Sequence, residues 1–576
     1  MTDLPRYSAD MFQAPDKECD IVMKGGITSG LVYPYAVLEL ARVYRLRSIG
    51  GTSAGAIAAA FTAAAEYARI VRDDPAGFVR LQARCDALPG ILAALFQPEP
   101  RFRALMQYLV RGQARGGSAW LWGLPRAFPL LSAVGLAGGA ALLWLLRGGI
   151  AGILLGALVG LLVAIGSHLL RLVLRELPAA GFGFCTGRTV PGNQVPGLTD
   201  WLHDSLQEIA FGHDAKARDP LTFGDLIGPD PLAPLIDLRM ITTNLSMRRP
   251  HTLPTLGVST GFSLAEWRSL FPPHVIAFLG RVTKPFAQLA ETQRFPEPAD
   301  LPVVVATRMS LSFPLLFTAV PTYTRDIASY AIARATGAQA PQVRKARMWF
   351  ADGGISSNFP IHLFDALFPA RPTFALSLDE LPEDAGSPND RVFIPQRAGQ
   401  GVGLPVRPIT GLAGFAGSIL GSAKDWQDQL LSTMPGQRER IARIFLSDRE
   451  GGLNLAMPED RSTALMGYGL QAGRQFAGGA LDFDEHRWRR SLVAYEQLEQ
   501  AVVGTEAVWS AGFGDWLAAY LDHPQSYKAV TMADRQNIHA RLARFAGLAA
   551  AFRPLIAHKR RKFPRPAGRL RIGPDF

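Results

Sequence analysis

Short apolar runs alternate with glycine-rich turns and helical patterns in the first part of the chain. Residues 21–23 form one such run, and residues 47–51 form a second. Each run is followed by a turn and then by a helical pattern, over residues 31–42 and 54–71. Short runs bounded by turns are typical of buried strands. We therefore predict two consecutive βα units, which imply a parallel sheet with right-handed crossovers and an α/β fold class.

Later apolar runs predict further elements of the same sheet. Strands are expected over residues 236–245, 301–306, 348–351 and 374–378, and a helix over residues 198–212. Beyond about residue 385 the composition shifts to a linker rich in glycine and proline, which continues to about residue 410. Mostly helical patterns follow this linker, so we expect a helical C-terminal region.

Two long apolar spans interrupt the globular pattern. Residues 127–146 and 150–167 contain no charged side chain, and Arg147-Gly148-Gly149 separates them. Each span approaches the ~20 residues that a helix needs to cross a bilayer. Glycines at helical spacing allow two helices to pack closely in lipid, and here they are Gly135, Gly139, Gly152, Gly156 and Gly160. Tryptophans and arginines flank the outer ends, which is typical of a membrane interface on the cytoplasmic side.

We therefore predict a transmembrane helical hairpin over residues 127–167, with both outer ends facing the cytoplasm. Three alternatives stay open. The hairpin could pack inside a soluble core, dip into one leaflet, or serve a soluble enzyme as a lid that admits lipid.

Composition and charge narrow the class of partner. Hydrophobic residues make up 48% of the 576 residues, charged residues 19%, and the net charge is +11. A basic excess indicates either nucleic acid or an anionic lipid surface. The chain has no zinc-finger spacing and no RNA-binding aromatic signature. We therefore expect an anionic membrane surface as partner and no nucleic acid. The basic tail over residues 559–571 is typical either of a solvated terminus or of a contact with lipid headgroups.

The cysteines and the N-terminus exclude other arrangements. Cys19, Cys85 and Cys185 are far apart and form no C-x-x-C, so neither a disulfide framework nor a cysteine metal site is indicated. Residues 1–18 are polar, contain two prolines and lack the apolar stretch of a signal peptide, so we expect a flexible lead.

The strongest chemical signal is Gly51-Thr52-Ser53-Ala54-Gly55, a G-x-S-x-G between an expected strand and an expected helix. In such a nucleophile elbow the glycines, Gly51 and Gly55, permit a sharp turn that exposes the serine hydroxyl. Ser53 is therefore the candidate nucleophile, which needs a base to accept its proton. The alternative is a structural serine that caps the following helix.

Asp352 is the candidate base. It follows an apolar strand and precedes two glycines, which we expect to place its carboxylate at the carboxyl edge of the sheet, beside Ser53. Asp-Gly is also an ordinary turn signal. A triad with histidine is disfavoured, because His362 lies only ten residues after Asp352 in a helix-like stretch and because only one strand precedes the strand that leads to Ser53.

A glycine-rich turn follows the first strand. Gly25, Gly26 and the next residue, Ile27, can present backbone N–H groups as an oxyanion hole. The alternative is a phosphate or dinucleotide loop, which fits poorly because the spacing is not G-x-G-x-x-G and no G-K-[ST] follows.

Together these motifs resemble the patatin-like phospholipase family. The matching segments occur in the family's order: Gly25-Gly26 to Gly30, Gly51 to Gly55, Ser310 to Phe317, and Asp352-Gly353-Gly354. The resemblance covers roughly residues 19–380, apart from the hairpin. It implies a three-layer α/β/α sandwich and a Ser53–Asp352 dyad without histidine, with the oxyanion held at the glycine turn. The sequence departs from the family at Ile27, where a third glycine is usual, and at Ser29, where a basic residue is usual.

The expected organisation divides the chain into five parts. They are a flexible lead (1–18), a first catalytic part (19–126), the hairpin (127–167), a second catalytic part (168–385) and a helical region with a basic tail (386–576). We expect no cofactor and no metal, although a calcium-assisted variant stays open.

The expected function is that of a membrane-associated serine acyl hydrolase acting on glycerolipid or phospholipid esters, of the phospholipase A or lipase type. We expect membrane lipids as substrate. The hairpin predicts a two-pass membrane protein with its catalytic domain on the cytoplasmic side, and the Ala-, Gly- and Arg-rich composition indicates a bacterium, so we expect the bacterial inner membrane. The alternatives are a transacylase, or a membrane scaffold whose dyad is idle and whose C-terminal region binds a protein partner.

Overall fold

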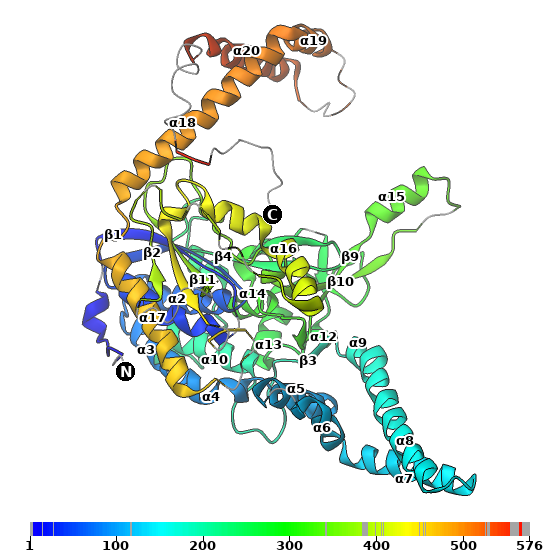
Figure 1. The fold of residues 1–576 in the computed structure, drawn as a ribbon. Helices are drawn as coiled ribbons and strands as arrows, with labels where there is room; N and C mark the ends of the chain where they lie inside the picture. Colours follow the sequence, from blue (N-terminus) through cyan, green and yellow to red (C-terminus); the bar gives the residue numbers. More distant parts are fainter. Residues whose placement is uncertain are drawn as a thin grey trace.

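The computed structural model describes most of the chain. The described residues are 4–13, 15–26, 28–115, 118–257, 259–339, 342–382, 390–397, 399–401, 403–404, 406, 408–447, 450–452, 454, 457–522, 524, 526, 530–552 and 564–566. Within this part, a large sheet with many helices around it forms a mixed α/β body (Figure 1). A helical hairpin, a helical arm and the segment that carries residues 327–335 project from this body. Of the predicted basic tail, only Pro564 to Pro566 belong to the described residues.

The described strands form two sheets. In the large sheet the order is β12-β13-β11-β1-β2-β4-β10-β9-β6-β7, with β5 paired to β4, and a small sheet pairs β3 with β8. The strands are β1 (Lys17–Met23), β2 (Tyr44–Thr52), β3 (Gly183–Cys185), β4 (Asp237–Asn244), β5 (Arg249–Leu253), β6 (Thr260–Phe262), β7 (Gln293–Arg294), β8 (Leu315–Phe317), β9 (Val320–Arg325), β10 (Lys345–Asp352), β11 (Thr373–Glu380), β12 (Val392–Phe393) and β13 (Ile441–Leu446).

Helices account for most of the remaining described chain. They are α1 (Tyr33–Ala41), α2 (Ala54–Val71), α3 (Ala76–Asp86), α4 (Leu88–Leu95), α5 (Arg103–Arg115), α6 (Ser118–Ala127), α7 (Pro129–Leu145), α8 (Ile150–Arg171), α9 (Leu177–Ala179), α10 (Leu198–Phe211), α11 (Phe223–Ile227), α12 (Leu264–Trp267), α13 (Pro273–Val282), α14 (Val303–Ser310), α15 (Ile327–Ala335), α16 (Gly411–Thr433), α17 (Glu459–Ala477), α18 (Phe483–Val508), α19 (Gly514–Tyr520) and α20 (Met532–Gly547).

The predicted βα units are confirmed. β1, α1, β2 and α2 follow one another, and β13, β11, β1, β2 and β4 run parallel. From β4 onward β10, β9, β6 and β7 are antiparallel, so the sheet is mixed.

The strands of the parallel half are buried on both faces. In β1, Ile21 and Met23 pack into the main core, whereas Val22 packs into a smaller cluster with Ala375 and Ile441. Because successive side chains of a strand point to opposite faces, this alternation shows that both faces of the sheet are covered. The smaller cluster is closed by the loop after β10 and by α16.

One predicted strand is wrong. The run Val303-Val304-Val305 belongs to α14, which begins after Pro302 and ends at Ser310. All eight residues of α14 are buried. A helix that is buried all round shows no polar face, so its apolar run cannot be told from a strand by periodicity.

The hairpin is formed by α7 and α8, which pack antiparallel and project from the body (Figure 1). Four of the predicted glycines lie at the crossing. A Cβ at Gly139 would lie 1.9 Å from Gly156 O, and a Cβ at Gly160 would lie 2.2 Å from Gly135 O. Only glycine therefore permits this approach. Gly152 has nothing within 4 Å in the described chain, so it lies outside the contact.

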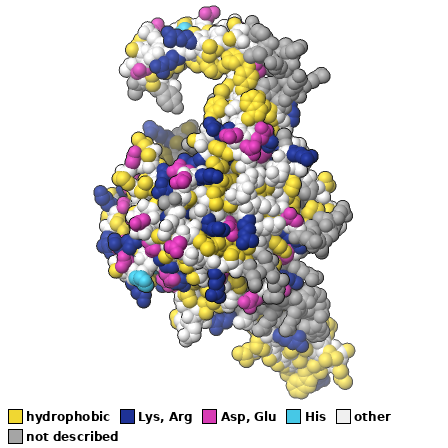
Figure 2. All heavy atoms as spheres, turned by 90° about the vertical axis from the view of Figure 1, so that its left-hand side faces the viewer, with side chains coloured by type: hydrophobic (Ala, Val, Ile, Leu, Met, Phe, Trp, Pro, Cys, Tyr) yellow, Lys and Arg dark blue, Asp and Glu magenta, His cyan; other side chains and the backbone are white. Residues whose placement is uncertain are grey.

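The outward faces of the hairpin are apolar. Figure 2 shows hydrophobic side chains gathered at the lower end of the molecule, where the hairpin projects. Exposed members include Leu142, Trp144, Leu146, Ile150, Leu154 and Leu158. The continuous helical stretch Ile150–Ala179 is long and apolar enough to cross a membrane, and only 11% of its most apolar window is buried. Ala54–Val71 passes the same test but is a core helix, with 78% of the window buried.

Candidate active site

Ser53 lies at a strained turn between β2 and α2. Its φ is 54° and its ψ is −127°, a backbone conformation that residues with a side chain rarely adopt. Both flanking glycines are required by close approach. A Cβ at Gly51 would lie 2.2 Å from Gly55 O, and a Cβ at Gly55 would lie 2.4 Å from Met23 O. The predicted elbow geometry is therefore present at residues 51–55.

A residue that the sequence analysis did not single out by itself holds this turn. The N–H of Ser53 donates to Ser310 Oγ at 3.1 Å, and the Ser310 hydroxyl donates to Ile241 O at 2.6 Å. Ser310 is fully buried at the end of α14 and thereby ties the elbow to β4. The only sequence feature that could have identified Ser310 is its position at the start of the segment Ser310–Phe317, which matches the family pattern.

Asp352 ends β10 at the same level of the sheet as the elbow. Thr52 of β2 pairs with Ile241 of β4, and the next residue, Thr242, pairs with Asp352. Asp352 therefore lies beside Ser53, as predicted. The reason given for this, that β10 ends at the same edge as the parallel strands, is wrong. β10 is antiparallel to β4, so the carboxyl end of β10 does not point to the edge of the sheet at which the parallel strands end. The register places Asp352 beside Ser53 instead.

The Asp352 carboxyl is buried and held on one side. The side chain is 3% exposed, and Oδ1 accepts the N–H of Gly354 at 2.7 Å. Oδ2 has no hydrogen-bond partner among the described residues. Burial raises the pKa of Asp352 to about 6, although the nearby Ser53 hydroxyl, the Gly354 N–H and the charge of Lys424 oppose the rise.

Ser53 and Asp352 are thus neighbours, but no hydrogen bond joins them in this conformation. The Ser53 hydroxyl donates to Gly26 O at 3.2 Å. It is nevertheless close enough to Asp352 to lower the pKa of that carboxyl. No histidine is among the groups that shift the pKa of Asp352 in the described part of the chain.

The glycine turn lies against the elbow. Gly26 O accepts both the Ser53 hydroxyl and, at 3.2 Å, the N–H of Ala54. The Gly25 N–H donates to Asn358 O at 2.7 Å, so this predicted oxyanion donor is already engaged. The Gly26 N–H has no acceptor within the residues described. Ile27, the third predicted donor, lies outside the described residues.

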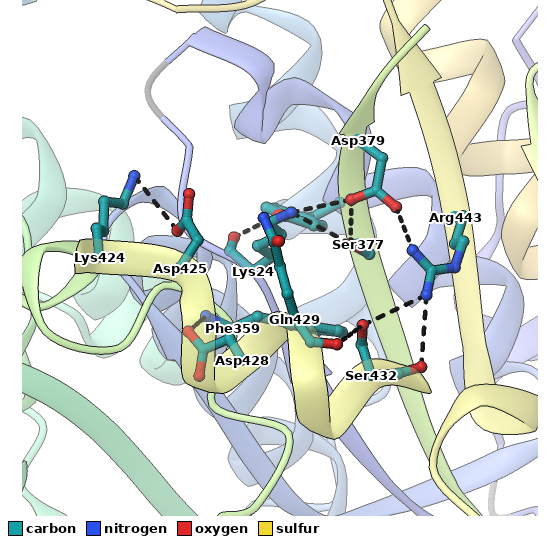
Figure 3. Close-up of polar contacts among 11 residues, drawn as sticks. Lys24, Phe359, Ser377, Asp379, Lys424, Asp425, Asp428, Gln429, Ser432 and Arg443 are labelled. Atoms are coloured by element: carbon teal, nitrogen blue, oxygen red, sulfur yellow. Dashed lines mark hydrogen bonds and ion pairs between the residues drawn. The ribbon is translucent and has the colours of Figure 1, made fainter. Parts of the chain in front are cut away.

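Charged side chains fix the start of this turn (Figure 3). Lys24 Nζ lies 2.9 Å from Asp379 Oδ1, and Arg443 Nη1 lies 3.0 Å from Asp379 Oδ2. Burial opposes the ionisation of Asp379, but Lys24 and Arg443 together hold its pKa down to about 2. The sequence analysis missed this network, because β11 and β13 bring its members together from distant positions.

A buried arginine orders the segment that supports Asp352. Arg308 is fully buried and donates to Ser312 Oγ at 2.5 Å, to Thr318 O at 3.0 Å and to Thr186 O at 3.1 Å. Ser312 O in turn accepts the N–H of Asp352 at 2.9 Å. Burial lowers the pKa of Arg308 to about 10. This side chain, which sequence reasoning also missed, fixes the loop on which the carboxyl rests.

An apolar cavity begins at the elbow. The space that the centre of a water molecule can reach inside it is about 80 Å³, and Gly30 and Ala54, the residue after Ser53, line it. Its walls come from α2, α4, α10 and the segment after α14, with Ala58, Phe96 and Trp201 among the lining residues. The cavity thus offers an apolar environment that starts next to the serine. Within the described chain, no three His, Cys, Asp or Glu side chains are grouped so as to hold a metal ion.

Comparisons with known proteins agree with the sequence motifs. A family model described as patatin-like phospholipase matches residues 21–365. A protein of Rhizobium meliloti (strain 1021) named RpoH suppressor is 35% identical over an alignment of 643 positions, which covers 98% of this chain and 100% of that protein.

Similar solved structures are distant. VipD from Legionella pneumophila is 13% identical, with a TM-score of 0.28 over 94% of this chain and 86% of that chain. ExoU of Pseudomonas aeruginosa, in its heterodimeric complex with SpcU, is 16% identical, with a TM-score of 0.24 over 96% of this chain and 79% of that chain.

Proposed function

The chain belongs to the patatin-like phospholipase family, and on this premise we propose that it is a membrane-associated serine acyl hydrolase that cleaves glycerolipid or phospholipid esters. One observation carries the proposal. The strained serine of the elbow lies beside a buried carboxyl with one open oxygen, and the next residue, Ala54, lines an apolar cavity. These three features are what acyl transfer from a lipid ester requires.

Ser53 is the proposed nucleophile and Asp352 its base. Asp352 Oδ2 accepts the hydroxyl proton while Ser53 Oγ bonds to the ester carbonyl carbon, whose oxygen becomes an oxyanion. The N–H groups of Gly26 and Ile27 stabilise that oxyanion. The carbon–oxygen bond to the alcohol then breaks, and the alcohol leaves with the proton held by Asp352. Water, deprotonated by Asp352, attacks the acyl carbon and releases the fatty acid, and the proton returns to Ser53.

The perturbed pKa of Asp352 supports its role as base. A value of about 6 leaves the carboxyl mostly ionised at neutral pH while giving it a higher proton affinity than an exposed aspartate. The fixed Oδ1 keeps the carboxyl oriented, because the Gly354 N–H occupies it. Oδ2 is therefore the oxygen that takes the proton.

The substrate class follows from the cavity. Its lining is almost entirely apolar and includes Ala54, the residue after the serine. A fatty acyl chain is the lipid group that such a space accommodates, because burial of each methylene contributes about 0.8 kcal/mol. We therefore assign the cavity to the acyl chain of the ester.

The hairpin supports membrane association. Its exposed faces are apolar, and α8 with its continuation is long enough to cross a bilayer. We propose that α7 and α8 span a bacterial inner membrane as a two-pass hairpin, with the catalytic parts (19–126 and 168–385) on the cytoplasmic side. The net charge of +11 favours contact with anionic headgroups on that face. Tethering raises the local concentration of lipid at the serine.

Hydrolysis by the purified full chain tests the proposal. The protein is incubated in mixed micelles with phospholipids and neutral glycerolipids, and released fatty acid is measured beside Ser53→Ala. Wild type is expected to release fatty acid and to be labelled by a fluorophosphonate, and Ser53→Ala to do neither. Acyl transfer to an added alcohol without net release would identify a transacylase. Failure of wild type to take up the probe, under conditions that label a known serine hydrolase, would refute the catalytic assignment and favour a scaffold.

A further inference from the structure

A carboxylate of α16 reaches the loop that follows the Asp352 turn. Asp428 is 6% exposed, and its Oδ2 accepts the N–H of Phe359 at 2.8 Å. Its Oδ1 accepts the hydroxyl of Ser357 at 3.4 Å. Figure 3 shows Asp428 on α16 directly against Phe359. α16 lies outside residues 21–365, the part of the chain that the family model matches.

The same loop contacts both turns of the candidate site through Asn358. Asn358 O accepts the N–H of Gly25 at 2.7 Å. Its side-chain Oδ1 packs on both turns as well, since a Cβ at Gly25 would lie 2.3 Å from it and a Cβ at Gly354 would lie 2.7 Å from it. Asn358 therefore sits between the glycine turn and the turn whose Gly354 N–H orients Asp352.

We propose that Asp428 is a positioning residue of the active site, which holds residues 357–359 from α16 so that Asn358 keeps the oxyanion turn and the Asp352 turn in place. The proposal rests on the function proposed above. It makes the C-terminal region a necessary part of the catalytic geometry, because the holding group lies beyond the family domain.

The chemistry of the contact determines which substitutions matter. Burial raises the pKa of Asp428 to about 6, so at neutral pH the side chain is mostly a carboxylate that accepts hydrogen bonds. Asparagine retains one acceptor oxygen for the Phe359 N–H, whereas alanine leaves that buried N–H unpaired. Displacement of a catalytic group by about 1 Å, even from a distant change, costs about 100-fold in rate.

Steady-state kinetics of the full chain in mixed micelles test the proposal. We expect Asp428→Ala to lower kcat about 30- to 100-fold with KM within about twofold of wild type. Asp428→Asn is expected to keep kcat within about fivefold, because it preserves the acceptor. Gln427→Ala is the matched control, since Gln427 is the exposed neighbour on the same helix, and it is expected to leave both constants unchanged. Unchanged kcat in Asp428→Ala would overturn the proposal.

Inhibitor affinity separates positioning from general loss of structure. A long-chain trifluoromethyl ketone forms a tetrahedral adduct that needs the oxyanion turn, whereas the free fatty acid binds as a ground-state product. Asp428→Ala should lower the affinity for the ketone at least tenfold and the affinity for the fatty acid less than twofold. Equal losses for both ligands would overturn the proposal. If the alanine variant does not fold, Asp428→Glu, which displaces the carboxylate by one methylene, is expected to show the same ketone-selective loss.

A measurement without turnover keeps this inference separate from the proposed function. Amide hydrogen exchange of peptides covering residues 24–26 and 357–359 is compared between wild type and Asp428→Ala. Faster exchange in both peptides is expected, since each loses its support. Unchanged exchange at residues 24–26 would overturn the proposal even if the protein proved to be catalytically inactive, an outcome that by itself would refute only the proposed function.

Discussion

Replacement of Asp352 by asparagine is predicted to stabilise the fold at neutral pH while removing activity. The wild-type carboxyl is buried, and only Oδ1 is hydrogen-bonded among the described residues. Asparagine is nearly isosteric and uncharged. Its carbonyl oxygen can accept the Gly354 N–H, and its amide group can occupy the place of the open Oδ2 and donate to Ser53. The substitution therefore removes a buried charge without leaving a new unpaired group.

The magnitude follows from the pKa of Asp352. Burial raises it from 3.8 to about 6, which corresponds to about 3 kcal/mol. Because the folded-state pKa is raised, the contribution to stability is fully present below pH 3.8 and is lost as pH rises through about 6. Between pH 4.5 and 7.5 the wild type should lose about 2 kcal/mol through this group. The asparagine variant has no such dependence, so its advantage over wild type should grow by the same amount.

Urea denaturation of the full chain in detergent, followed by tryptophan fluorescence, measures the free energy of unfolding at both pH values. Asp379→Asn is the matched control. Lys24 and Arg443 hold the pKa of Asp379 down to about 2, so its contribution is present above the unfolded-state pKa and is lost only as pH falls toward 2. The control should therefore destabilise the protein at pH 4.5 and at 7.5 alike.

One result would refute this reasoning. If the difference in unfolding free energy between Asp352→Asn and wild type is the same at pH 4.5 and 7.5, then the carboxyl does not titrate near pH 6 in the folded protein. In that case a raised pKa would no longer support Asp352 as the base, whatever the effect of the variant on activity.

Three further predictions concern other parts of the molecule. Because the base has a pKa of about 6, kcat/KM should rise with pH and reach a plateau above pH 7. At pH 5 it should be about a tenth of the plateau value, as measured by fatty acid release at a series of pH values. Ser53→Ala should stay at background at every pH. Gly139→Leu should lower the melting temperature in detergent and Gly138→Leu should not, because only the first meets a facing backbone oxygen. Ala58→Trp should fill the cavity and cut kcat/KM for long-chain esters at least tenfold while sparing acetyl esters, which a chain-length series measures.

The parallel half of the fold was predictable because its signals are local. α2 begins and ends at the residues expected, since an alanine-rich run without breakers follows the elbow. α14 was not predictable by the same reasoning. Its three valines favour a strand, and only the surrounding core, which buries the element on every side, makes it a helix.

In the candidate site, too, residues with a local sequence signal could be predicted, whereas residues placed by long-range contacts could not. Ser53, Gly51 and Gly55 could be identified from a five-residue pattern, because the turn needs glycine where a Cβ would lie within 2.4 Å of a backbone oxygen. The neighbourhood of Asp352 could not be derived from strand direction, since β10 is antiparallel to β4 and only the register brings it beside the elbow. Ser310 gave no signal of its own, because its role is a hydrogen bond across 257 positions.

The change of composition near residue 385 does not mark the end of the sheet, because the chain leaves the sheet there and later returns to it. β13 pairs in parallel with β11, so residues 441–446 continue the sheet on the side away from the site. α17 packs along α1 and joins it through the ion pair of Arg474 with Glu39 at 3.2 Å. Without β13 the N–H and C=O groups along one edge of β11 would lose their partners, and without α17 the face of α1 that it covers would be exposed. The strand that bears Asp379, and with it the anchor of Lys24 before the glycine turn, therefore depends on residues that composition alone assigns to a separate region.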